Sequence, residues 1–186
     1  MENIDVDTIR ACRQGDPAAA MRIYDALRHK VYAIAHHYTN DPDRAQDLAQ
    51  EAFMRIFAHI GSFRCESALS TWAYRVTVNT ILGELRRDRP CEVLPDDLAE
   101  SRASVKPERR LVSAELGEKI AQAVVELPDT LRIVFVLVAM EDLAYAEVAK
   151  ILALSVEAVR MRMSRARARL RKRLRPYLTG ESYDEM

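Results

Sequence analysis

The chain has 186 residues, 49% hydrophobic and 30% charged, so it is long enough for two small domains that each bury a core. Its five glycines and the absence of alternating β-branched runs favour helices over strands. No run of about 18 uncharged apolar residues is present, which excludes a transmembrane helix. The acidic first residues lack the apolar core of a secretion signal, so we expect a cytoplasmic protein.

Apolar residues recur at helical spacing through the N-terminal half of the chain. The spacing predicts helices at 5–12, 17–38, 43–60 and 71–87. The third predicted helix carries its apolar residues in steps of three and four, which places them on one stripe. This stripe comprises Ala45, Leu48, Ala49, Ala52, Phe53, Ile56 and Ile60. A loop at 62–70 separates the third and fourth helices.

A segment without a helical apolar stripe follows the fourth predicted helix. It contains Pro90 and Pro95, with Pro107 just beyond, and reads as a linker. We therefore divide the chain into an N-terminal domain at 5–88, a flexible linker at 89–107, a C-terminal domain at 108–176 and an acidic tail at 177–186.

The C-terminal domain also reads as helical. Four helices are expected, at 111–127, 129–140, 143–152 and 156–175, with a tight turn at 153–155 between the last two. Two helices joined by a short turn, the second of them basic, are the outline of a helix-turn-helix. The expected fold class is all-α, with two small helical domains.

Charge is distributed unevenly although 28 basic residues balance 28 acidic ones. The segment 128–178 holds 11 basic and 5 acidic residues, and the final helix holds nine of those cations against Glu157 alone. Such asymmetry predicts a polyanionic partner. Val159, Met163, Ala166, Leu170 and Leu174 form the core-facing stripe of this helix.

The first turns of the basic helix are the candidate DNA-reading surface. A helix fits the major groove of B-DNA, and arginine binds guanine edges or phosphates. The candidate residues are Arg160, Met161, Arg162, Ser164 and Arg165. The alternative is a solvated basic face, and for the distal cations 171–175 it is at least as well supported.

Two stretches in order resemble one family. DRAQDLAQEAFMRIF at 43–57 and FRCESALSTWAYRVTVN at 63–79 resemble region 2 of sigma factors of the extracytoplasmic-function (ECF) type. Leu127-Pro128, LAYAEVA at 143–149 and AVRMRMSRAR at 158–167 resemble region 4 of the same factors. The resemblance covers both predicted domains and implies a region 2 bundle and a region 4 helix-turn-helix.

The resemblance implies a non-catalytic specificity subunit that binds core RNA polymerase and promoter DNA. It implies contact with the clamp helices of the largest subunit, and with the flap region. The residues that correspond to the clamp-binding surface are Asp47, Gln50, Glu51, Met54 and Arg55. Read without the family, they form an ordinary solvated helix face.

The resemblance further implies that the 62–70 loop and the 71–87 helix open the promoter near position −10. Opening requires a pocket for an unstacked base, with cations and aromatic rings beside single-stranded DNA. The residues of this candidate surface are Arg64, Ser67, Thr71, Trp72, Arg75, Asn79, Arg86 and Arg87. For Trp72, core packing is an equal alternative, and Phe63 is expected in the core. The basic helix would read the −35 element.

The family pattern carries further expectations and three departures. ECF relatives are commonly held inactive by an anti-sigma factor, so we expect one here. Cys65 stands where the family usually has glycine, and Glu157-Ala158 replaces a pair of small residues. Ala144 replaces a serine, so Glu147 is expected to lose its capping-box partner at a cost of about 1 kcal/mol.

Two other function classes remain as alternatives. A self-sufficient helix-turn-helix regulator would bind duplex DNA by itself, usually as a dimer, but no long heptad seam is present. A small helical enzyme would need a nucleophile–base pair, a phosphate loop or paired metal ligands, and no such motif occurs. We expect no cofactor and no metal. Cys12, Cys65 and Cys91 are scattered and expected to be reduced thiols.

Overall fold

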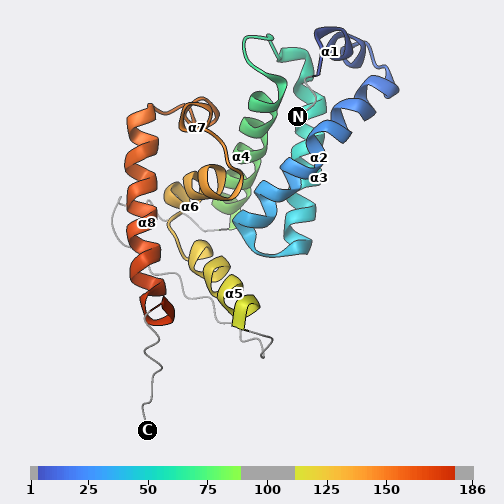
Figure 1. Ribbon diagram of the computed structural model, residues 1–186. Helices are drawn as coiled ribbons and strands as arrows, with labels where there is room; N and C mark the ends of the chain where they lie inside the picture. Colours follow the sequence, from blue (N-terminus) through green and yellow to red (C-terminus); the bar gives the residue numbers. More distant parts are fainter. Residues whose placement is uncertain (1–3, 89–111, 179–186) are drawn as a thin grey trace.

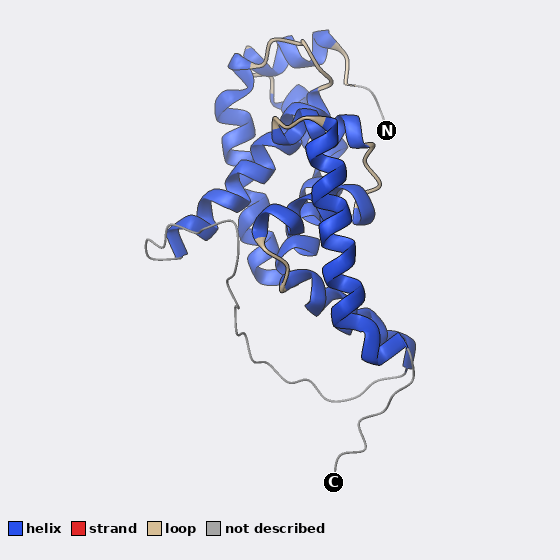
Figure 2. Ribbon diagram, turned by 90° about the vertical axis from the view of Figure 1, so that its left-hand side faces the viewer, coloured by secondary structure: helices blue, strands red, loops and turns tan. Residues whose placement is uncertain are grey.

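The computed structural model describes residues 4–88 and 112–178, and within these ranges every regular element is a helix (Figures 1 and 2). The described residues form two modules, one on each side of the undescribed segment 89–111. The expected all-α class is confirmed. The predicted linker at 89–107 lies outside the described residues, and so does the predicted tail at 177–186 except for 177–178, which end the last helix.

The N-terminal module is a bundle of four helices, as predicted. Its elements are α1 (Val6–Arg13), α2 (Pro17–Thr39), α3 (Pro42–His59) and α4 (Leu69–Asp88), with a short 3-10 turn, η1 (Ile60–Ser62), after α3. Aspartates begin the helices: Asp16 accepts a hydrogen bond from the amide of Ala18, and Asp41 from those of Asp43 and Arg44. Asn40 ends α2 in the left-handed region at φ 53°, which asparagine tolerates.

The predicted stripe of α3 is buried throughout. All seven of its apolar residues, from Ala45 to Ile60, lie in the core, where α3 packs against α2 and α4. Phe63 is also buried, as expected. The steps of three and four along the sequence therefore identified the buried face of this helix correctly.

The C-terminal module also follows its predicted helices closely. Its elements are α5 (Val112–Val125), α6 (Asp129–Phe135), a π-helical turn η2 (Val136–Met140), α7 (Tyr145–Leu152) and α8 (Val156–Leu178). The turn between α7 and α8 is tight because Ala153 adopts φ 53° and the amide of Leu154 donates to Ala149. Ser155 caps α8 by accepting a hydrogen bond from the amide of Ala158, at 3.0 Å.

The first turn of α7 corrects one expectation. Glu147 keeps half of a capping box, because its Oε2 accepts a hydrogen bond from the backbone amide of Ala144 at 3.1 Å. Only the reciprocal bond is missing, since the alanine side chain has no acceptor. The amide of Glu147 donates instead to the carbonyl of Ala144, at 2.9 Å.

The two modules pack directly on each other, which the sequence did not predict. One continuous set of buried apolar residues joins α2, α3 and α4 to Ile133, Val134 and Leu137, and to the helix-turn-helix. In Figure 1, α6 and α7 lie between α8 and the N-terminal bundle. A second, smaller core lies among α5, α6, η2 and α8.

Candidate nucleic-acid interface

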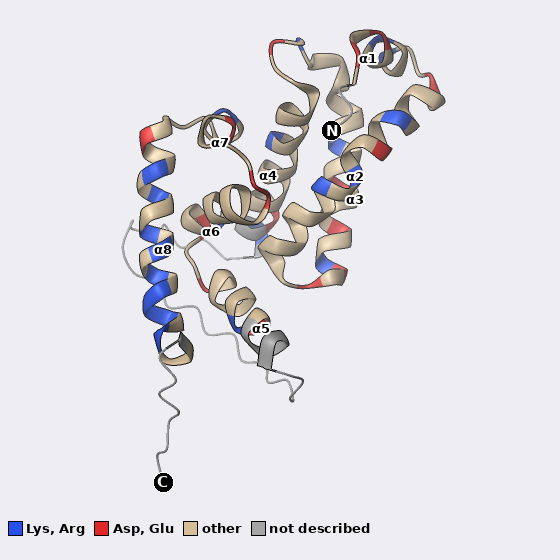
Figure 3. Ribbon diagram, in the orientation of Figure 1, with Lys and Arg blue, Asp and Glu red and all other residues tan. Residues whose placement is uncertain are grey.

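The first turns of α8 present the predicted DNA-reading residues to solvent. Arg160, Ser164 and Arg165 are exposed, Arg162 is half-buried, and the side chain of Met161 is 53% exposed. The opposite side of the helix is anchored, because Val159, Met163, Ala166 and Leu170 are all buried. The helix therefore presents Arg160 and Arg165 on its accessible side, with Arg162 at the margin of the buried stripe. Figure 3 shows Lys and Arg positions recurring along α8 below its first turn.

The distal cations of α8 include one with a structural partner. Arg173 Nε lies 2.8 Å from Glu126 Oε2 at the end of α5, and this hydrogen-bonded ion pair raises the pKa of the guanidinium. Arg173 thus ties the end of α8 to α5. The structural reading that we kept for cations 171–175 is supported at this position.

The second predicted surface comprises the 62–70 loop and α4. Arg64, Arg75, Asn79 and Arg87 are exposed, whereas Ser67 and Trp72 are half-buried and Thr71 is buried. The rings of Trp72 and Phe63 lie 5.5 Å apart, so the indole rests partly on the core. The side chain of Arg86 lies outside the described part of the structure. Loop and helix thus carry four exposed polar side chains, of which Arg75 faces α7 and Arg87 lies beside α3.

The loop contains a left-handed backbone conformation at Cys65, one of the positions where this chain departs from the family pattern. Cys65 is exposed and has φ 57°, in the left-handed region that favours glycine. A glycine at this position would relieve the backbone strain, whereas the cysteine of this chain retains it. Arg13 of α1 supports the start of the loop by donating to the carbonyls of Ile60, at 3.1 Å, and Phe63.

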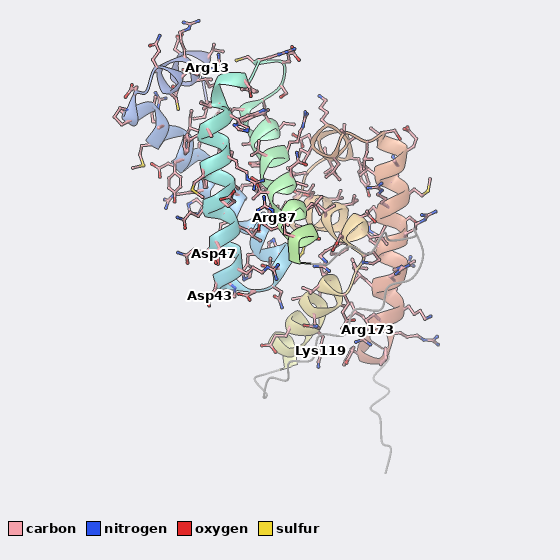
Figure 4. All side chains as sticks on the ribbon, turned by 180° about the vertical axis from the view of Figure 1, so that it is seen from behind. Arg13, Asp43, Asp47, Arg87, Lys119 and Arg173 are labelled. Carbon is pink, nitrogen blue, oxygen red and sulfur yellow. The ribbon has the colours of Figure 1, made fainter. Side chains whose placement is uncertain are left out.

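The proposed polymerase-binding residues lie on one side of α3. Asp47, Gln50 and Met54 are exposed, while Glu51 and Arg55 are half-buried and joined by an ion pair of 2.7 Å. A shallow hollow between α3 and the end of α4 adjoins them. Its lining residues are Arg44, Asp47, Leu48, Glu51, Glu84 and Arg87. Figure 4 shows Asp43 and Asp47 pointing away from the C-terminal module.

A buried carboxylate joins the two modules, and sequence reasoning missed it. Glu141 follows η2, and its side chain is 3% exposed. Its Oε2 lies 2.9 Å from Lys30 Nζ and its Oε1 lies 2.6 Å from His37 Nδ1, both on α2. Lys30 also donates to the backbone carbonyl of Glu141, at 2.6 Å. We call Lys30, His37 and Glu141 the Glu141 cluster.

A second polar contact between the modules surrounds the end of α2. The Tyr38 hydroxyl donates to Asp129 Oδ1 at 2.8 Å, and the guanidinium of buried Arg132 lies 4.7 Å from the centre of the Tyr38 ring. Arg132 also donates to the carbonyl of Leu127 at 3.1 Å. No pattern in the sequence indicated these pairings, because the partners lie about a hundred residues apart along the chain.

Tyr74 of α4 points into the same interface without a hydrogen-bond partner. The residue is 2% exposed, and its hydroxyl is unpaired among the described side chains. Burial, and then the nearby carboxylates of Glu141 and Glu147, raise the pKa of Tyr74 to about 12. The hydroxyl therefore stays protonated at neutral pH.

The described residues, 4–88 and 112–178, contain neither a cluster of metal ligands nor a membrane-spanning helix. Within these ranges, no group of three or more His, Cys, Asp or Glu side chains is placed to hold a metal ion. None of the helices described there is both long and apolar enough to cross a membrane.

Family models match both modules separately. The model for Sigma-70 region 2 matches residues 23–90, and the model for Sigma-70 region 4 matches residues 117–170. These ranges contain the α3–α4 surface and the α7–α8 helix-turn-helix. The two matches occur in the order that the motifs predict.

Curated relatives match over nearly the whole chain. The ECF RNA polymerase sigma factor SigW of Bacillus subtilis is 33% identical over 94% of this chain and 99% of its own length. The RNA polymerase sigma-H factor of Pseudomonas aeruginosa is 32% identical over 94% of this chain and 95% of its length. The ECF sigma-E factor of Escherichia coli K12 is 30% identical over 91% of this chain and 94% of its length.

Solved structures share the fold. CnrH in complex with the cytosolic domain of CnrY aligns with a TM-score of 0.68 at 22% identity, over 96% of this chain and 99% of that chain. The sigma factor RpoE of Bartonella quintana, in complex with the anti-sigma factor NepR, aligns with a TM-score of 0.62 at 21% identity, over 83% and 96% of the two chains. On the family models and the curated relatives together, this chain belongs to the ECF-type sigma factors of the sigma-70 family.

Proposed function

We propose that this chain is an alternative sigma factor that binds core RNA polymerase and directs initiation at specific promoters. The observation that carries the proposal is the pair of exposed arginines, Arg160 and Arg165, on the first turns of α8, in a helix-turn-helix that follows a region 2 bundle. The α7–α8 unit has the form that docks a recognition helix in a major groove. This unit would read the −35 element as duplex.

The N-terminal module would open the promoter near −10 and hold the polymerase. Arg64, Arg75, Asn79 and Arg87 offer exposed cations and an amide to a melted strand. Asp47, Gln50 and Met54 offer a mixed polar and apolar patch to the clamp helices, and region 4 would meet the flap. The chain would act in the cytoplasm and contribute specificity, not catalysis.

An anti-sigma factor is expected to control the chain. In the solved structures above, the sigma factor RpoE is bound to the anti-sigma factor NepR, and CnrH is bound to the cytosolic domain of CnrY. The first of these complexes supports a partner of the anti-sigma class here. Such a partner would hold the chain inactive by covering the polymerase-binding side of α3.

Transcription in vitro with purified core polymerase tests the proposed function. We expect initiation at promoters that core polymerase alone does not use. Charge reversal at Arg160 or Arg162 should lower this initiation at least about fivefold, because each arginine supplies about 1–3 kcal/mol of base recognition. Co-elution with core polymerase should be unchanged.

Arg171→Glu is the matched control for these variants. It makes the same charge change on the same helix, beyond the first turns, and should leave most of the activity. Absence of new start sites with the unmodified chain would refute the proposal. Strong duplex binding by the chain alone, without polymerase, would favour the self-sufficient regulator instead.

A further inference from the structure

The docked arrangement of the two modules is incompatible with simultaneous contact at both promoter elements. The names of the −35 and −10 elements place them about 25 base pairs apart, or about 85 Å along the duplex. A compact chain of this length has a radius of gyration of about 16 Å, so it is roughly 40 Å across. One module must leave the other before both elements can be bound.

The docked arrangement also occupies a residue of the candidate −10 surface. Arg75 Nη2 of α4 donates to the carbonyl of Lys150 on α7, at 3.0 Å. Val148, Ala149 and Ile151 of α7 are buried in the core that they share with the N-terminal bundle. The helix-turn-helix therefore lies against the helix that is expected to contact melted DNA.

We propose that the Glu141 cluster is an intramolecular lock, which keeps the free chain closed until polymerase or promoter DNA separates the modules. The inference rests on the proposed function and concerns its regulation. It differs from control by a second protein, because every group involved belongs to this chain.

Glu141 suits this role because docking buries its charge and pairs it only with groups of the other module. A carboxylate that is 3% exposed has little water around it, and its two charged or polar side-chain partners come from α2 of the other module. Removing one partner from a buried pair strands the other charge. Undocking instead returns all three groups to water, where each is hydrated. The cluster therefore stabilises the closed state, and the free energy of opening stays small enough for a binding partner to supply.

Tyr74 supplies an opposing contribution at the same interface. Its hydroxyl is buried without a partner when the modules are docked, and undocking would let water reach it. This loss of hydration disfavours the closed state. The balance between Glu141 and Tyr74 gives two single substitutions that should shift the equilibrium in opposite directions.

Energy transfer between two dyes on the free chain tests the proposal without polymerase or DNA. The three native cysteines are replaced by serine, and dyes are attached at Ala58→Cys on α3 and Ala168→Cys on α8, both exposed. We expect the unmodified interface to give mainly the high-transfer, closed state. Glu141→Gln should raise the ratio of open to closed chains about tenfold or more, and Tyr74→Phe should lower it several-fold.

Asp142→Asn is the matched control. Asp142 follows Glu141 directly, is exposed and has φ 54°, which asparagine tolerates, so this change removes one negative charge without touching the cluster. Circular dichroism should show the same helix content in all variants. A chain that is mainly open before substitution, or Glu141→Gln behaving like Asp142→Asn, would overturn the lock.

A charge swap gives an independent check. Glu141→Lys should open the chain, and adding Lys30→Glu should restore part of the closed population. Failure of this rescue, with both variants folded, would also count against the lock. Because the transfer measurement involves no promoter, it is distinct from the transcription assay: loss of specific initiation would refute the proposed function and leave the closure result standing.

Discussion

At the scale of single residues, Cys65 shows how a backbone requirement can be met by an unfavourable side chain. The loop before α4 turns through φ 57°, and a residue with a Cβ atom is disfavoured there by about 1–2 kcal/mol. A glycine at this position would not carry that cost. The loop keeps its turn here because Arg13 and the buried Phe63 hold its beginning.

We therefore expect Cys65→Gly to stabilise the chain. The relief of strain exceeds the extra unfolded-state entropy of glycine, so the free energy of unfolding should rise by about 0.5–1 kcal/mol. Urea unfolding followed by circular dichroism measures this change. Cys65→Ser is the control, since it removes the thiol and retains the strain; an equal gain in both variants would show that the thiol, not the backbone, was responsible.

At the scale of elements, α3 combines a buried apolar stripe with an exposed face whose residues do not pack in the core. The steps of three and four account for every buried residue of the helix. Met54 is 55% exposed and lies outside the buried stripe, so core packing does not account for an apolar residue at this position. A face of this mixed character is what a docking surface for another helix requires.

The α3 face predicts the result of a polymerase-binding experiment. Asp47→Lys combined with Gln50→Ala should weaken co-elution with core polymerase at least about tenfold, because both exposed side chains lie in the proposed contact. Asp25→Lys, the same charge reversal on an exposed position of α2, should co-elute normally. Normal co-elution of the folded double variant would exclude this face as the clamp contact.

At the scale of the whole molecule, the interface between the modules contains both a buried ion pair and a buried hydroxyl without a hydrogen-bond partner. The Glu141 cluster and the Tyr38, Asp129 and Arg132 contacts hold the modules together. Tyr74 adds a cost that depends on pH, because its pKa is raised to about 12 by burial and by two carboxylates. Docking of the modules therefore buries paired polar groups, which is favourable, and the unpaired Tyr74 hydroxyl, which is unfavourable.

Alkaline pH should destabilise the chain through Tyr74. Below pH 10 the tyrosine is protonated in both states, so its contribution is fully present. As pH rises from about 10 to 12, the unfolded chain releases the proton and the folded chain does not, which lowers the free energy of unfolding by about 2 kcal/mol. Urea unfolding at pH 9 and pH 11 should show a smaller loss for Tyr74→Phe.

Tyr32→Phe is the control for the alkaline experiment. Tyr32 is 39% exposed, so the same substitution there should leave the pH dependence of the unmodified chain. Equal losses in the unmodified chain and in Tyr74→Phe would mean that the hydroxyl reaches water in the folded protein. At neutral pH, Tyr74→Phe should raise the free energy of unfolding by about 1 kcal/mol, because it removes an unpaired buried donor.

The sequence by itself determined the helices, their buried faces and the family. Periodicity fixes the helices and their buried faces because a helix brings residues three and four positions apart onto one side, as along α3 and α8. The family was indicated by the motifs of the two domains. The exposure of Arg160 and Arg165 followed from the same geometry, and Ser155 was recognisable as a cap from its type and place. Thr71, which the family resemblance placed on the −10 surface, is buried here, and residue spacing did not indicate this.

Only the tertiary structure decided how the modules meet. Glu141 pairs with Lys30 and His37 across 111 and 104 positions, and no local pattern marks a charged residue that is buried by a distant module. The half capping box at Ala144 and the left-handed turn at Cys65 likewise depend on backbone positions that residue type does not fix. Local spacing determines which face of a helix is apolar, but the choice of what covers that face is made by the rest of the chain.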